Sequence, residues 1–465
     1  MKTLMYSLAA GFVFAGLFHG HRPGLNVLLL ALVTTALILV NQHKRPVPLF
    51  PAAAYVYSAF FCFLSPEPLA LLIHVLCFIL LGGAYATGKT SLYIQGLAGI
   101  TNLPLGILLG LTEGWAFPRE HRDRVNRKIG TVLGGVAISM LLVGLFGALY
   151  AVSNPVFSDL LDAIDLSFMS PAWIGLLVLG TLVYRNLLAP YDPSRLTAAD
   201  AEFGNALLPP EAQPGADSAS RIDRELLYGK MALWALNTLL LFFLVLDVYY
   251  LAQGPPDTAM RQSEAVHQGV YALIVSLVLA MAVVTVLFRG SLNFYPGGKT
   301  LKRLAYAWLF LNTVLLGNTA LKNAYYVVDS GLTFKRLGVF LFLTLVLSGL
   351  WSVSRKIRDK KSVVYLLRVN SAVAFAVLTA MLSLPWNQWI TAYNLKFIKE
   401  PDMRYLLQLD PANAPVLNRY LQVNGDRVHW ETAREIRMRY RDYREAQQAL
   451  DWPEWNAGTL KFREP

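Results

Sequence analysis

The stretch from Met231 to Ala252 reads MALWALNTLLLFFLVLDVYYLA, and it decides the class of fold. It contains one charged residue, Asp247, and it is long enough for a helix to cross about 30 Å of hydrocarbon, which takes roughly 20 apolar residues. The rest of the 465-residue chain has the same character, because 55% of its residues are hydrophobic and 15% are charged. Soluble domains carry about 25% charged residues. The composition therefore excludes an ordinary soluble enzyme and indicates a protein of the lipid bilayer.

Eleven apolar runs of this kind lie between charged residues along the chain. We predict an all-α fold, a polytopic transmembrane helix bundle of about 11 spans, followed by a small C-terminal extracytoplasmic module. The lipid bilayer is thus the first partner that the sequence predicts. The runs are Thr3–Gly20, Gly24–Val40, Pro48–Leu64, Pro68–Tyr85, Ile129–Val152, Ala172–Leu188, Met231–Ala252, Gly269–Phe288, Leu304–Val328, Leu337–Ser354 and Leu367–Trp386.

Lysine and arginine residues set the expected orientation, because positively charged loops stay on the cytoplasmic side. With the N-terminus inside, the inner segments carry 24 basic residues and the outer loops carry 5, and the other 12 follow Trp386 in a tail that lies outside. Leu92–Trp115 leaves an alternative open. It is apolar enough to span, but Pro104 and five glycines suit a re-entrant or interfacial segment. If it spans, the balance becomes 21 inside and 8 outside, so the first arrangement is favoured.

We expect three parts along the chain. Residues 1–128 hold the N-terminal spans and the re-entrant or interfacial segment, and residues 129–386 hold the main transmembrane bundle. Within the second part, residues 191–228 contain four prolines among alanine, aspartate and serine, which predicts a flexible cytoplasmic loop without a fold. Residues 387–465 form an extracytoplasmic tail module whose amphipathic helical pattern fits either a cap on the span ends or a docking surface for a protein partner.

One motif has the letters of a nucleotide site. The residues from Gly83 to Thr90 read GAYATGKT and fit the phosphate-binding pattern G-x-x-x-x-G-K-[ST]. That pattern works between a parallel strand and a helix, whereas here the preceding run is a predicted span. The motifs H-E-x-x-H and G-x-S-x-G are absent, and Cys62 and Cys77 lie inside spans. We therefore expect no catalytic residue, no metal, no cofactor, and neither a nucleotide nor a nucleic acid as a partner.

Several short motifs of the second half carry a family resemblance. They are Ser263–Tyr271, Lys322–Tyr326, Gly331–Leu337, Asp402–Leu409 and Ala414–Leu417. With them the chain resembles, over about residues 172–421, the multi-pass bacterial membrane proteins grouped as domain of unknown function 4173 and its sibling 4153. The resemblance implies a protein of the bacterial cytoplasmic (inner) membrane, and it carries over no catalytic residue, because the family has no established activity.

The Gly331 motif has a structural interpretation as well. Gly331 is expected to end one helix with a positive φ, and the Thr333 side chain to cap the next helix. A tight outer turn between two spans needs both features.

Ionisable residues gather near the predicted outer ends of three spans. At 1.5 Å per residue, Asp247 lies about 24 Å and Lys322 about 27 Å above the inner starts of their spans. Glu264 and His267 lie at the outer start of the span between them, and Asp329 shares a helix face with Lys322. A lone charge at membrane depth costs on the order of 3 kcal/mol, so we expect Asp247 and Lys322 to pair and the five residues to line an outward-opening substrate-binding site. Alternatively, the lysine and glutamate side chains simply extend to water.

Two functions remain open from the sequence. The first is a transporter or translocation component with this polar site near the outer face, which ionisable residues inside spans favour. The second is a non-catalytic sensor or assembly protein whose outer tail binds a partner, which the size of the tail favours. A membrane-embedded enzyme is a third and less favoured interpretation.

Overall fold

The computed structural model describes residues 2–41, 47–105, 170–190, 194–207, 209, 216–252, 275–276, 278–288 and 291–463, with the positions 139, 142, 146, 150, 153 and 154. Within these residues the regular elements are helices, as the sequence predicts. The α-helices are α1 (Lys2–Phe18), α2 (Leu25–Val40), α3 (Leu49–Leu64), α4 (Pro68–Thr87), α5 (Leu92–Ile100), α9 (Pro171–Leu188), α10 (Ser194–Glu202), α11 (Ala216–Ala252), α13 (Lys299–Ser330), α14 (Phe334–Arg358), α15 (Val363–Met381), α16 (Trp386–Phe397), α17 (Met403–Gln408), α18 (Ala414–Asn424), α19 (Trp430–Gln448) and α20 (Ala457–Arg463).

Six of these helices are long and apolar enough to cross a membrane, namely α4, α9, α11, α13, α14 and α15. Four shorter apolar helices join them, which are α1, α2, α3 and the segment Val278–Leu287. The predicted run Ile129–Val152 lies largely outside the described residues, so the count of 11 spans stays a prediction. In the part of the chain that the structure describes, the fold is nevertheless all-helical, with several membrane-spanning candidates.

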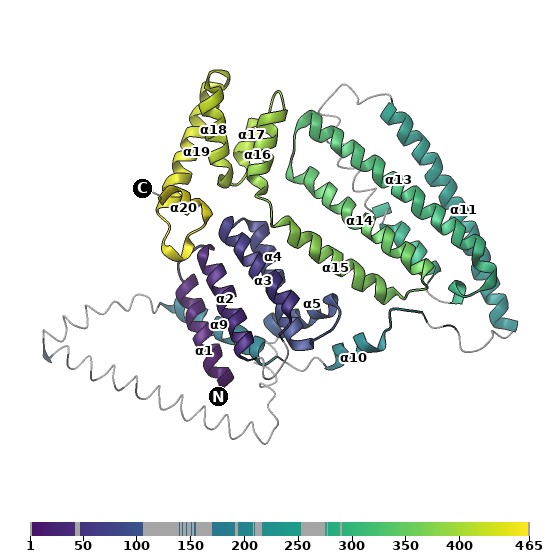
Figure 1. Ribbon diagram of the computed structural model, residues 1–465, viewed down its shortest axis with the longest axis horizontal. Coiled ribbons are helices and arrows are strands. Elements are labelled where there is room, and N and C mark those ends of the chain that lie inside the picture. The colour runs from purple at the N-terminus through teal and green to yellow at the C-terminus, as the bar shows by residue number, and fades with distance from the viewer. Residues whose placement is uncertain are drawn as a thin grey trace.

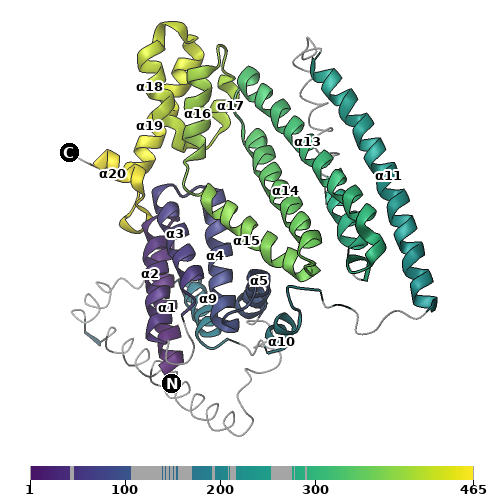
Figure 2. The same cartoon turned by 45° about the vertical axis from the view of Figure 1, so that its right-hand side comes forward.

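The first bundle consists of α1 to α5 and α9, which lie together in Figures 1 and 2. Buried polar groups join these helices: the Thr34 and Tyr184 hydroxyls lie 2.5 Å apart, and the Asn41 amide donates to the Leu188 carbonyl at 3.1 Å. Helix α9 belongs here although the expected division at residue 129 groups it with the second half. The reason is a close approach of α1 and α9, where a Cβ on Gly11 would collide with Thr181.

Helix α5 folds back along α4 and opens the segment Leu92–Trp115. A Cβ on Gly83 would collide with the backbone carbonyl of Gln95, and a Cβ on Gly99 would collide with the carbonyl of Ile79. Glycine at both positions therefore lets the two backbones touch. The π-helical turn η1 (Thr101–Leu105) follows, and the segment beyond it lies outside the described residues. The re-entrant or interfacial placement of Leu92–Trp115 stays a prediction.

The second bundle consists of α11, α13, α14, part of α15 and the segment 278–288. Its core consists mostly of leucine and valine side chains, together with two alanines, Ile357, Phe288 and Trp308. In Figures 1 and 2, α15 lies between this bundle and the first one. Its Leu366 packs in the core of the second bundle, whereas its Phe375 and Leu382, just beyond its last turn, pack in the core of the first. Helix α15 is therefore the element that the two bundles share.

The segment 191–228 corrects the prediction of a loop without a fold. It contains α10 and the first turns of α11, which starts at Ala216, ahead of the predicted start of the span at Met231. Composition alone suggests disorder, because a segment with few apolar side chains can bury little apolar surface. The order of α10 comes instead from polar contacts of Asp200 with distant residues, which are described below.

The tail packs on the end of both bundles that we call the outer end, following the predicted orientation. Its helices share a small core that includes Ile390, Leu417 and Ile436. The Asn394 amide donates to the Leu332 carbonyl at 2.9 Å, which ties the tail to the turn between α13 and α14. The Leu25 amide donates to the Trp455 carbonyl at 2.7 Å, which ties it to α2. The tail therefore contacts both bundles, and its role as a cap or as a docking surface stays a prediction.

The turn between α13 and α14 has the predicted form. Gly331 ends α13 with a φ of +88°, and the Thr333 hydroxyl accepts a hydrogen bond from the Arg336 amide at 3.3 Å at the start of α14. The structural interpretation of this motif is confirmed.

Candidate functional site

The predicted polar cluster contains a half-buried ion pair between α11 and α13. The Lys322 ammonium donates to the Asp247 carboxylate, and the two side chains are 26% and 11% exposed. The helices α11 and α13 pack along their length, so the similar depths expected for the two residues place them face to face. Within apolar helices an unpaired charge has a high desolvation free energy, and pairing the two charges offsets part of that cost.

Of the other three predicted site residues, the structure describes Asp329 alone. Asp329 lies on the last turn of α13, where it is exposed and accepts a hydrogen bond from the Ser330 hydroxyl at 2.7 Å. Glu264 and His267 lie outside the described residues. The structure thus brings two of the five residues together, and the role of all five as a substrate-binding site stays a prediction.

Sequence reasoning missed an ionic junction at the inner end of the bundles. The Arg368 guanidinium of α15 donates to the Asp200 carboxylate at 3.0 Å and to the Ser91 hydroxyl at 2.7 Å. Asp200 also accepts from the Ser91 amide at 2.8 Å. Burial raises the pKa of Asp200, but the hydrogen bonds from Ser91 and Arg368 outweigh it, and the pKa lies below its usual value. This junction connects α5, α10 and α15.

The motif with the nucleotide-site letters lies next to this junction. Gly83 to Thr87 belong to the last turns of α4, Gly88 ends the helix with a φ of +70°, and the Thr87 and Thr90 hydroxyls lie 2.8 Å apart. Its backbone amides up to Gly88 are therefore those of a helix and its C-terminal cap.

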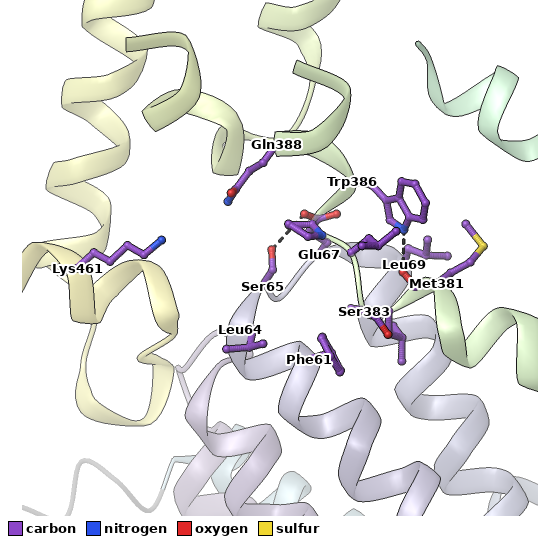
Figure 3. Close-up of a pocket in the computed structure, with 14 residues that line it drawn as sticks. Phe61, Leu64, Ser65, Glu67, Leu69, Met381, Ser383, Trp386, Gln388 and Lys461 are labelled. Carbon is purple, nitrogen blue, oxygen red and sulfur yellow. Dashed lines mark hydrogen bonds between the residues drawn. The ribbon is translucent and has the colours of Figure 1, made fainter. Parts of the chain in front are cut away.

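A pocket of about 190 Å³ opens at the outer end, where the α3–α4 turn, the α15–α16 connection and α20 meet. Figure 3 shows Glu67 at its centre, with the Ser65 hydroxyl donating to the carboxylate at 3.1 Å, and with Lys461 reaching in from α20. Sequence reasoning missed Glu67 because it lies in a short turn between two spans. One signal could have found it, since Glu67 is the only acidic residue before Glu113.

The comparisons with known proteins give one family. The family model described as domain of unknown function (DUF4153) matches residues 3–420, which is nearly the whole chain, whereas the resemblance to the 4173 sibling is not shown. No curated protein and no solved structure matches the chain. The apolar helices and this match agree on an integral membrane protein of unknown activity. The chain belongs to the DUF4153 family.

Proposed function

We propose that this protein is a transporter or translocation component of the bacterial cytoplasmic membrane, with its N-terminus inside, its C-terminus outside and an outward-opening polar site around Asp247 and Lys322. The observation that supports the proposal is the ion pair between α11 and α13. Ionisable residues inside spans are rare, face the bundle interior and mark the paths of polar solutes. Hydrophobic residues of similar size would hold two helices together without this desolvation cost.

Water access to the pair separates a transport site from a purely structural contact. In a variant without Cys62 and Cys77, a cysteine is placed at Asn318, one helical turn below Lys322, and a membrane-impermeant cationic thiol reagent is added from outside. An outward-opening site predicts modification of Asn318→Cys. The matched control Leu321→Cys replaces a side chain on the surface of the bundle, where lipid excludes the reagent. Lack of modification at Asn318, or modification from inside alone, contradicts the proposal.

The pairing itself is tested by removing one charge and then both. Lys322→Ala leaves the Asp247 carboxylate uncompensated and is expected to lower stability by on the order of 3 kcal/mol. Adding Asp247→Asn is expected to restore part of that loss. Full additivity of the two losses in unfolding experiments is incompatible with a direct pair.

A non-catalytic sensor or assembly protein is the second candidate. The observation that favours it is the exposed apolar side chains of Val423 and Trp430, on either side of the connection between α18 and α19. A docking role predicts stable co-purification of an extracytoplasmic protein. The combined variant Val423→Ser and Trp430→Ala should lose it, whereas Trp452→Ala, which changes an exposed tryptophan elsewhere on the tail, should keep it. Equal recovery of the partner with both variants excludes this surface.

A further inference from the structure

The outer pocket joins three parts of the chain that are far apart in sequence. Its apolar wall comes from the outer ends of α3, α4 and α15, with Phe61, Leu69 and Met381 among the lining residues. Polar groups lie opposite, with Gln388 of α16 and Lys461 of α20 among them. A space of about 190 Å³ with one apolar and one polar side suits a small amphiphilic group rather than bulk water.

Glu67 supplies a buried carboxylate without a cationic partner. The residue is 9% exposed, and its donors are the neutral Ser65 hydroxyl and Asn387 amide. Among the described residues, no lysine, arginine or histidine forms an ion pair with it. Burial raises the pKa of Glu67, the two hydrogen bonds lower it, and the nearby Asp410 raises it, with an upward shift as the result. A buried charge normally has a partner of opposite charge, and the Glu67 carboxylate lacks one within the protein residues described here.

Lys461 lines the same pocket and forms no ion pair with Glu67. Figure 3 shows its ammonium group pointing toward the carboxylate across the space that lies between them. The pocket therefore presents a negative and a positive group at two positions next to an apolar wall. A molecule that satisfies all three features carries an ammonium group, a separate anionic group and an apolar part or a small volume.

We propose that the outer pocket binds a zwitterion, with its ammonium group on Glu67 and its anionic group on Lys461. The chemistry is that of an ethanolamine phosphodiester, which exists as a phospholipid headgroup in the membrane or as a free solute. The site is separate from the Asp247–Lys322 pair, so it stands whether or not that pair serves transport.

Isothermal titration calorimetry of the purified full-length chain in detergent tests the proposal with two pairs of probes. Glycerophosphoethanolamine and dihexanoyl phosphatidylethanolamine carry the zwitterion, and the corresponding glycerol phosphodiesters lack the ammonium group. At least one ethanolamine compound is expected to bind saturably and at least tenfold more tightly than its glycerol counterpart. Equal binding of the free headgroup and the lipid indicates a free solute, and a tenfold preference for the lipid indicates a lipid headgroup. Absence of saturable binding by both overturns the proposal.

Substitutions assign the two charged contacts. Glu67→Gln should weaken ethanolamine binding at least tenfold, whereas the exposed control Glu431→Gln should leave it unchanged. Lys461→Gln should weaken binding of the phosphodiester but not of free 2-aminoethanol, and Lys399→Gln should change neither. Unaltered ethanolamine affinity in Glu67→Gln overturns the assignment.

The melting temperature of Glu67→Gln without ligand shows whether the variant has a folding defect. Glutamine keeps an oxygen for the Ser65 and Asn387 donors and removes the uncompensated charge, so the melting temperature should equal or exceed that of the wild type. A clear fall would show that the carboxylate is a structural group and would overturn the proposal.

Discussion

Replacing Arg368 with alanine is expected to loosen the inner junction between the two bundles. The guanidinium group makes five hydrogen bonds, which no smaller side chain can reproduce. Nε donates to the Ser91 hydroxyl at 2.7 Å, Nη1 to the Asn205 side-chain oxygen at 2.6 Å, and Nη2 to the Asp200 carbonyl, the Asp200 carboxylate and the Phe203 carbonyl at 2.6, 3.0 and 3.1 Å. Alanine leaves a carboxylate that is held by the Ser91 amide and hydroxyl and by Tyr93 alone.

The size of the loss follows from the burial of the pair. The Asp200 side chain is 8% exposed and that of Arg368 is 23% exposed. Removing one partner of a buried pair costs about 3–5 kcal/mol, and solvent at the guanidinium places this pair at the lower end, at about 3 kcal/mol. The matched control is Arg358→Ala, because Arg358 and Asp359 form an ion pair with side chains 59% and 32% exposed. That control should cost much less than Arg368→Ala, because solvent screens an exposed ion pair.

Unfolding of the purified chain in mixed micelles, titrated with a denaturing detergent, measures both free energies. Arg368→Lys should lie between wild type and alanine, since a lysine ammonium can reach one or two of the acceptors but cannot match the planar fork. Equal, small losses for Arg368→Ala and Arg358→Ala would refute the reasoning, because burial would then make no difference to the two ion pairs.

Three further predictions concern packing, pH and topology. Gly83→Ala should destabilise by about 1–3 kcal/mol, because its Cβ meets the backbone of α5, whereas Gly96→Ala meets only a leucine methyl at 3.7 Å and should be tolerated in the same unfolding assay. The lowered pKa of Asp200 means that its ionised form stabilises the fold above about pH 4, so the stability advantage of wild type over Asp200→Asn should vanish as the pH falls below that value. A periplasm-active reporter fused after Trp386 should be active and one fused after Arg358 inactive, and the reverse result would overturn the orientation of the second half.

The sequence was sufficient for features that depend only on position along the chain, such as the ends of a helix or the depth of a residue within a span. Apolar runs locate helices such as α2 and α14 to within a few residues, because length and charge punctuation define a span. Depth along a span is also one-dimensional, which is why the arithmetic placed Asp247 and Lys322 at one level. The Gly331 turn needed only local rules for helix ends.

Features that depend on which helices are neighbours could not be predicted in this way. Helix α9 joins the first bundle through a glycine contact with α1. The pattern of apolar residues in α9 does not identify α1 as its neighbour. The order of α10 comes from Asp200, whose partners Ser91 and Arg368 lie more than 100 residues away in opposite directions along the chain. Composition rules count apolar residues and therefore treat such a segment as a loop.

Helix α15 shows why the missed sites are located where they are. Most of its residues are apolar, with Arg368, Asn370 and Ser371 grouped in its first half, and this pattern does not identify its packing partners. In the structure it contacts one bundle through Leu366 and the other through Phe375. Arg368 serves the inner end, and the connection that follows Met381 forms one wall of the Glu67 pocket at the outer end. The two sites that the sequence did not reveal, around Arg368 and around Glu67, thus lie near opposite ends of the helix that the two bundles share.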